Sequence, residues 1–152
     1  MLTIADGRPA DLDEVQALLR RVGPSIEGVA DRIADFLIAR EDGRLIAVAA
    51  LEDHGTAGLL RSVAVAPERQ SWGLARYLIN ALIERARNRG HAAVYLLTQD
   101  AELYFKRHGF RRIGRNEVRP AVLASGQFQG ESCASSTVMV LDLTEGPSAK
   151  ED

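Results

Sequence analysis

A change of hydrophobic period after residue 66 limits the fold of this chain more than any other feature. The run Gly58–Ala66 is typical of a strand, whereas apolar residues from Leu74 recur at helical spacing until Gly90. The run Ala92–Thr98 is apolar without interruption, as expected of a buried strand. A strand, a helix and a second strand in this order predict a parallel crossover. We therefore expect an α/β fold with parallel strands in its sheet.

The segments before this crossover predict a helix and an antiparallel meander. Leu2-Thr3-Ile4 indicates a short strand, and Asp11 is a good N-cap for a helix that ends near Gly23. Two apolar runs, Asp35–Ala39 and Leu45–Leu51, are joined by Glu41-Asp42-Gly43-Arg44, a tight hairpin signal. The stretch from Pro24 to Asp31 follows no clear pattern.

The last third predicts short elements. Helical patterns cover Ala101–Arg107 and Pro120–Ala124, and strands are expected at Phe110–Ile113 and Thr137–Leu143. The length of 152 residues fits one domain, which we expect over residues 1–145, with a flexible tail at 146–152.

Composition excludes several classes of protein. A hydrophobic fraction of 46%, without a run long enough to span a bilayer, predicts a cytoplasmic protein with no membrane contact. The net charge of -2 argues against a nucleic-acid surface. The single cysteine, Cys133, can form neither an internal disulfide nor a multi-cysteine metal site. Any bound anion must therefore be held locally.

The loop that joins the first strand of the crossover to its helix can hold such an anion. A helix N-terminus offers unpaired N–H groups and a partial positive charge, so it can bind a pyrophosphate without a basic cluster. Gly73 has no side chain to obstruct the phosphates, and Ala75 is small where close approach is also needed. A connecting turn with an incidental glycine is the alternative, but the position of the loop between a strand and a strong helix favours the anion site.

Two landmarks carry a resemblance to a known family. Gln70-x-x-Gly73-x-Ala75, after Val63-x-Val65-x-Pro67, resembles the phosphate-loop motif of the GNAT N-acetyltransferases, and the stretch Phe105–Phe110 resembles that family's helix closing in Gly-Phe. The resemblance implies the GNAT fold, a mixed central sheet with splayed parallel strands flanked by helices. It also implies acetyl-CoA, with pantetheine along the strand and pyrophosphate on the loop. The implied cofactor residues are Val63, Ala64, Val65, Gln70, Ser71, Trp72, Gly73, Leu74, Ala75 and Arg76.

The family's catalytic side chains are replaced in this chain. Many GNAT enzymes carry a glutamate base and a tyrosine acid at the positions that hold Ser62 and Phe105 here. Tyr104 is the candidate acid, although one residue of displacement turns it about 100° on a helix. Glu52 is the candidate base, with Asp53, His54 and Glu131 as alternatives near strand ends. The chemistry requires no metal.

Arg61 is a charged side chain in an otherwise apolar run. A guanidinium at the cleft would bind a carboxylate, phosphonate or arsonate-like group in a bidentate fashion. An outward position on an exposed sheet face is an equal alternative.

The C-terminal third narrows the resemblance. The segments Arg119–Val122, Gln127-Phe128 and Cys133–Ser136 resemble N-acetyltransferases of arsenic-resistance operons, which are similar to the acetyltransferase domain of N-acetylglutamate synthase. This implies transfer to the α-amine of an amino acid, including an arsenic- or phosphorus-containing glutamate analogue. Direct transfer is expected, because no sequence signature pairs Cys133 with a histidine as an acyl-enzyme nucleophile. Ser136, Cys133, Ser62 and Arg61 are the expected substrate-binding residues. A single thiol makes an arsenite binder unexpected.

Two other functions stay open at this point: a protein or peptide acetyltransferase, and an acetyl-CoA-binding module without catalysis. We expect a small-molecule amine as the partner, and the sequence leaves open whether the chain forms a homodimer.

Overall fold

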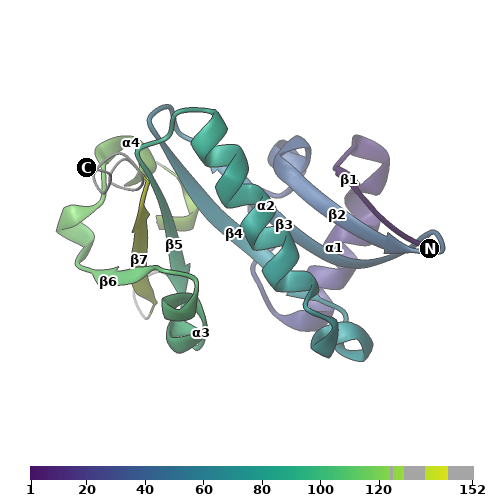
Figure 1. The fold of residues 1–152 in the computed structure, drawn as a ribbon. Helices are drawn as coiled ribbons and strands as arrows, with labels where there is room; N and C mark the ends of the chain where they lie inside the picture. The colour runs from purple at the N-terminus through teal and green to yellow at the C-terminus, as the bar shows by residue number, and fades with distance from the viewer. Residues whose placement is uncertain (124, 129–135, 144–152) are drawn as a thin grey trace. The chain divides into compact units, whose positions relative to one another are not determined.

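The computed structural model describes residues 1–123, 125–128 and 136–143. Contacts group the chain into two units, one of residues 1–52 and 60–84 and the other of residues 53–59 and 85–152. Strand β4 (Ala57–Val65) and helix α2 (Leu74–Asn88) contribute to both units (Figure 1). The predicted domain boundary at residue 145 lies outside the described residues.

The first unit contains the antiparallel meander. Its strands are β1 (Leu2–Asp6), β2 (Phe36–Glu41) and β3 (Arg44–Asp53), and the strand order is β1-β2-β3-β4. The β2–β3 turn is the predicted one, because Asp42 (φ 51°) and Gly43 (φ 87°) both adopt the left-handed conformation of a two-residue hairpin. The N-terminal amine also binds the Asp42 carboxylate.

Helix α1 (Leu12–Val22) packs through Val15, Leu18 and Leu19, which are buried. Asp11 lies at the predicted N-cap position of this helix, but its side chain makes no capping hydrogen bond.

The reason is a short 3-10 turn, Pro9–Asp11, that precedes the helix and places Asp11 in the helical region. The Asp11 carboxylate instead accepts hydrogen bonds from the Arg8 N–H at 2.9 Å and from Arg40 Nη2 at 2.8 Å. Burial alone would raise the pKa of Asp11, but these donors lower it below its ordinary value.

The segment without a sequence pattern forms an irregular loop followed by a 3-10 helix, Ala30–Asp35. Within the loop, the Val29 N–H donates to the Ile26 carbonyl at 3.1 Å, and Gly28 has φ 75°. A positive φ at the third position of a four-residue turn favours glycine. The Val29 side chain is fully buried and anchors the turn.

The second unit contains the predicted crossover and a further antiparallel pair. Strand β5 (Ala93–Thr98) pairs in parallel with β4, with Leu59 opposite Tyr95. Strands β7 (Thr137–Asp142) and β6 (Arg111–Ile113) continue the order β4-β5-β7-β6 in antiparallel pairs. The predicted mixed sheet with helices is therefore confirmed.

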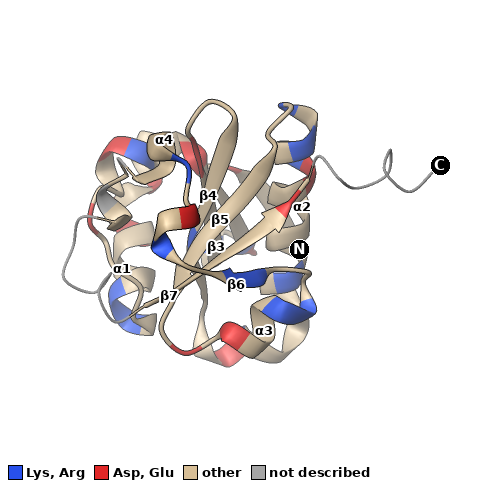
Figure 2. Cartoon of the chain, turned by 90° about the vertical axis from the view of Figure 1, so that its left-hand side faces the viewer, with Lys and Arg blue, Asp and Glu red and all other residues tan. Residues whose placement is uncertain are grey.

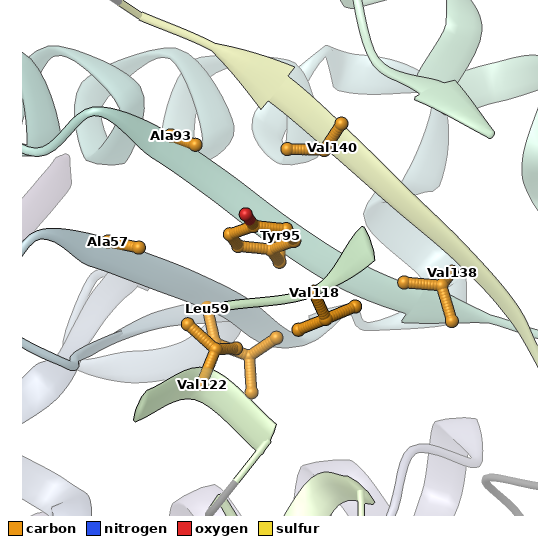
Figure 3. Packing of buried hydrophobic residues seen from close by; sticks show 8 residues of the cluster. All are labelled: Ala57, Leu59, Ala93, Tyr95, Val118, Val122, Val138 and Val140. Carbon is orange, nitrogen blue, oxygen red and sulfur yellow. The ribbon is translucent and has the colours of Figure 1, made fainter. Parts of the chain in front are cut away.

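A cluster of apolar side chains around Tyr95 forms part of the core of the second unit. Tyr95 points from β5 into a cluster that β4, β7 and helix α4 (Pro120–Leu123) complete (Figure 3). The cluster consists of Ala57, Leu59, Ala93, Tyr95, Val118, Val122, Val138 and Val140. Burial of this apolar surface holds α4 against the sheet.

The surface of the second unit carries both signs of charge. Figure 2 shows basic residues on β6 near helix α3 (Glu102–Arg107), whose first turn is acidic. The Arg112 Nη1 atom lies 3.9 Å from the Glu102 carboxylate, and Lys106 Nζ lies 3.5 Å from it. Among the described residues, no helix has both the length and the apolar character to cross a membrane.

Candidate active site

The loop between β4 and α2 contains a 3-10 helix, Pro67–Trp72, and Gly73 connects this 3-10 helix to the start of α2. The Tyr77 N–H donates to the Gly73 carbonyl at 3.0 Å, which makes Gly73 the last residue before the helix proper. The amides of Leu74, Ala75 and Arg76 therefore precede the first helical hydrogen bond and have no partner one turn earlier in the helix. They form the most anion-attracting part of the loop.

Gly73 leaves room above these amides. Its φ of 75° is left-handed, and a Cβ built on it would meet no atom within 4 Å. The backbone conformation therefore favours glycine, and the space beside it is open to a ligand. Ala75 is half-buried and adds only one methyl group. This cradle fits a pyrophosphate held by main-chain N–H groups.

Side-chain hydrogen bonds within the first unit stabilise the loop between β4 and α2. Gln70 Nε2 donates to the Val65 carbonyl at 3.2 Å, which folds the loop back on the end of β4. Glu68 accepts hydrogen bonds from Arg21 and Arg44, both at 2.6 Å. The Arg21 hydrogen bond is the main cause of a lowered pKa at Glu68.

Arg69 and Trp72 form a second contact on the loop. The Arg69 guanidinium lies 4.5 Å from the centre of the Trp72 ring and is paired with Glu41 at 2.6 Å. One face of the exposed tryptophan is thus covered by a cation. The loop arginine that could assist a phosphate already has a carboxylate partner, whereas Arg76 is exposed.

Ser62 has a left-handed backbone inside β4, with φ 58°. A non-glycine residue in this region costs about 1–3 kcal/mol and persists only where its surroundings hold it. Ser62 is buried and directly precedes Val63, the first of the predicted cofactor-binding residues. Sequence reasoning could not detect this conformation, because serine carries no marker for positive φ.

Arg61 is buried, so an outward position on an exposed sheet face is excluded. Its Nη1 donates to Glu52 Oε2 at 3.0 Å, and its Nε donates to Ser62 Oγ at 3.0 Å. Its Nη2 reaches the carbonyls of Glu27 at 2.7 Å and Ser25 at 3.4 Å. These bonds take four of the five guanidinium N–H donors. The bidentate fork expected for a substrate carboxylate is therefore not presented in this arrangement.

The Glu52 side chain is buried against Arg61 and is not exposed to solvent. Its side chain is 3% exposed, and Arg32 Nε approaches the same oxygen to 3.8 Å. A carboxylate bound in this way can reach an amine only if its contacts with Arg61 change. Glu52 as a general base stays a prediction.

The two aromatic residues of α3 differ in burial. Phe105 is buried, with its ring centre 5.9 Å from that of Phe110, whereas Tyr104 is half-buried. The Tyr104 ring packs edge-on against Phe105 at 5.2 Å and His108 at 4.9 Å. The ring packing is consistent with a structural role, and its hydroxyl as the acid stays a prediction.

The remaining predicted residues belong to the second unit. Ser136 is half-buried just before β7, and its carbonyl accepts a hydrogen bond from Arg115 at 3.4 Å. Cys133 and Glu131 lie outside the described residues. Within residues 1–123, 125–128 and 136–143, no three His, Cys, Asp or Glu side chains gather as a metal site would require.

Comparison with known proteins gives consistent results. Residues 11–110 match the acetyltransferase (GNAT) family. An amino-acid acetyltransferase of Pseudomonas paraeruginosa is 34% identical over 123 residues, which are 80% of this chain and 28% of that protein. An amino-acid acetyltransferase of Neisseria meningitidis is 26% identical over 126 residues, 77% of this chain and 29% of the relative. The chain thus spans less than a third of these relatives.

Solved structures agree on the fold. N-acetylglutamate synthase from Neisseria gonorrhoeae, complexed with coenzyme A and N-acetyl-glutamate, superposes with a TM-score of 0.80 at 24% identity, covering 94% of this chain and 35% of that one. The Rv2747 protein from Mycobacterium tuberculosis, in a complex that contains CoA, has a TM-score of 0.76 at 20% identity over 93% of this chain and 99% of its own.

Proposed function

The chain belongs to the acetyltransferase (GNAT) family, and from this premise we propose that it transfers an acetyl group from acetyl-CoA to the α-amine of an amino acid. The observation that carries the proposal is the Gly73 cradle at the start of α2, where open space and unpaired amides coincide. Relatives named amino-acid acetyltransferase support the acceptor class.

The cofactor would be held chiefly by main chain. The amides of Gly73 to Arg76 would bind the pyrophosphate, together with the neighbouring Ser71 and Trp72. The backbone of Val63, Ala64 and Val65 would bind the pantetheine arm in the manner of an added strand. Acetyl-CoA supplies an activated acyl group as a thioester.

The residues of this chain would then orient the amine and move protons. A neutral amine held beside the thioester gains much of its rate from proximity, so a strong base is not required. Tyr104 would donate a proton to the departing sulfur, and Glu52 would receive the amine proton through an intervening water. Of the expected substrate-binding residues in the first unit, Ser62 would contact the acceptor, and Arg61 would act on the acceptor through Ser62.

The substrate proposed in detail is glutamate or an arsenic- or phosphorus-containing analogue of it. The C-terminal resemblance to N-acetyltransferases of arsenic-resistance operons supports the analogue, and the Neisseria gonorrhoeae structure with N-acetyl-glutamate supports the parent amino acid. Acetylation removes the charge of the α-amine and would disarm a toxic analogue.

The decisive test is CoA release from acetyl-CoA across a panel of α-amino acids, glutamate, a phosphinic analogue and an arsenical analogue, with peptides as a second panel. We expect turnover with at least one α-amino acid. Turnover with peptides alone would favour a protein acetyltransferase. Binding of CoA by calorimetry without turnover in either panel would leave a non-catalytic acetyl-CoA module, which the replacement of the usual base and acid by Ser62 and Phe105 favours.

A further inference from the structure

Arg61 organises a loop that has no regular secondary structure of its own. The turn from Ile26 to Val29 contains one backbone hydrogen bond, and the Glu27 carbonyl in its middle accepts from Arg61 Nη2 at 2.7 Å. The Ser25 carbonyl, just before the turn, accepts from the same nitrogen at 3.4 Å. These hydrogen bonds are partly buried, so water competes with the guanidinium for the two carbonyls only from one side. The Arg61 guanidinium therefore supplies these carbonyls with the N–H donors that a neighbouring strand or helical turn supplies in regular secondary structure.

The Arg61 guanidinium also determines which hydrogen bonds the Ser62 hydroxyl can make. Its Nε donates to Ser62 Oγ, so the serine oxygen acts as acceptor toward Arg61 and its own hydrogen is directed elsewhere. In the part of the chain that the structure describes, no contact shows a residue accepting that hydrogen. The hydroxyl is buried, and it belongs to the one residue of β4 with a left-handed backbone. Both the backbone and the side chain of Ser62 are thus held in a defined direction.

Glu52 in turn holds Arg61. The pair is almost completely buried, with side-chain exposures of 3% for Glu52 and 4% for Arg61, and the two charges cancel. An ion pair without net charge attracts a ligand anion only weakly. The Ser62 O–H group, in contrast, can donate a directed hydrogen bond to such an anion. Hydrogen bonds from a neutral donor to a carboxylate are short and strong, since the acceptor is ionised.

We propose that Arg61 and Glu52 are positioning residues that aim the Ser62 hydroxyl, as a hydrogen-bond donor, at the α-carboxylate of the acceptor amino acid. The proposal rests on the proposed function. It replaces the bidentate Arg61 clamp by an indirect route, in which the effect of Arg61 on the acceptor passes through Ser62. No proton is transferred in this contact, because Ser62 donates a hydrogen bond and retains its hydrogen.

The test compares L-glutamate with its α-methyl ester as acceptors for wild type, Ser62→Ala, Arg61→Lys and the double variant. The ester lacks the α-carboxylate charge, so the ratio of kcat/KM for acid over ester measures recognition of that group. We expect each single variant to lower the ratio about tenfold through KM for glutamate, with KM for acetyl-CoA within about twofold of wild type. The double variant should be no worse than the more damaged single variant, because the two residues act as one unit.

Two outcomes of this cycle would overturn the proposal. A ratio that falls in Arg61→Lys but not in Ser62→Ala would mean that Arg61 binds the carboxylate directly. Losses that multiply in the double variant would mean that the two residues act independently. Glu52→Gln keeps the shape of the Glu52–Arg61 pair and should also lower the ratio of kcat/KM for acid over ester. This variant keeps the proposal testable if Arg61→Lys folds poorly.

Hydrogen–deuterium exchange separates this proposal from the proposed function. Arg61→Lys should speed exchange at the Val29 amide at least fivefold, whereas Arg40→Lys, a change at another partly buried arginine of the same unit, should leave it unchanged. If wild type acetylates no α-amino acid, the proposed function fails, and equal exchange in wild type and Arg61→Lys would overturn the positioning role as well.

Discussion

Replacing Gly73 by alanine should separate the cost of backbone strain from the loss of a cofactor site. The φ of 75° would be imposed on a residue with a Cβ, at about 1–2 kcal/mol, and the lower entropy of the unfolded alanine chain offsets roughly 0.4–1 kcal/mol of that. No atom lies within 4 Å of the new Cβ, so no clash adds to this figure. The net loss of about 1 kcal/mol corresponds to a fall in Tm of about 2–4 °C.

The effect on CoA should be larger than the effect on stability. A methyl group in the open space beside Gly73 would compete with a phosphate for that space and remove at least one charge-assisted hydrogen bond to the loop amides, worth about 1.5–3 kcal/mol. We therefore expect Gly73→Ala to weaken CoA binding about 10- to 150-fold in isothermal titration calorimetry.

Gly90 provides a matched control at the other end of α2. Its φ is 79°, and a Cβ added to it would likewise meet nothing within 4 Å, so Gly90→Ala carries the same strain. Its Tm should fall by a similar amount while CoA binding stays at the wild-type value. If the two variants bound CoA equally well, the assignment of the Gly73 cradle to the pyrophosphate would be refuted.

Three further outcomes follow from the side-chain contacts. Arg61→Met removes the nearest cationic partner of the buried Glu52 carboxylate, which should cost about 3–5 kcal/mol in urea unfolding, and adding Glu52→Leu should recover most of it; additive losses would contradict the pairing. Arg40 lowers the pKa of Asp11 and of Glu14, so the stability it contributes is present above about pH 4 and lost as pH falls through the lowered folded values. The Tm gap between wild type and Arg40→Met should accordingly be widest near pH 7 and close toward pH 2, and a gap independent of pH would refute this cause. Tyr104→Phe should lower kcat at least tenfold with KM unchanged if the hydroxyl serves the leaving sulfur, and an unchanged kcat would assign Tyr104 to packing alone.

The elements that the sequence predicts correctly are those specified by a short stretch of chain. The hairpin at Asp42-Gly43 follows from two adjacent residues that tolerate positive φ. Helix α2 follows from its apolar spacing and from glycines at both ends. The parallel pairing of β4 with β5 follows from the order of strand, helix and strand.

The features that sequence analysis missed depend on contacts between distant segments. Asp11 looked like a helix cap, but the turn that begins at Pro9 had already placed it in the helical region and Arg40, 29 positions away, binds its carboxylate. The burial of Arg61 depends on Glu52, nine positions away, and on the Glu27 carbonyl, 34 positions away. No local pattern marks these partners, since an isolated arginine in an apolar run is compatible with either face of a strand.

This difference explains why the cofactor is easier to predict than the acceptor. Phosphate recognition by main-chain amides needs no particular side chain, only the absence of bulk at Gly73 and Ala75, and that absence is visible within three positions. Acceptor recognition by the proposed arrangement needs the hydroxyl of Ser62 to be directed by Arg61, which the turn from Ile26 to Val29 must accommodate. Proteins of this family can therefore share the loop and differ in acceptor. A new side chain at position 61 would remove the donors that bind Glu52 and the Glu27 carbonyl, and a new side chain at position 62 would remove the acceptor of Arg61 Nε. A change of acceptor in this chain would therefore require residues 61 and 62 to change together with that turn.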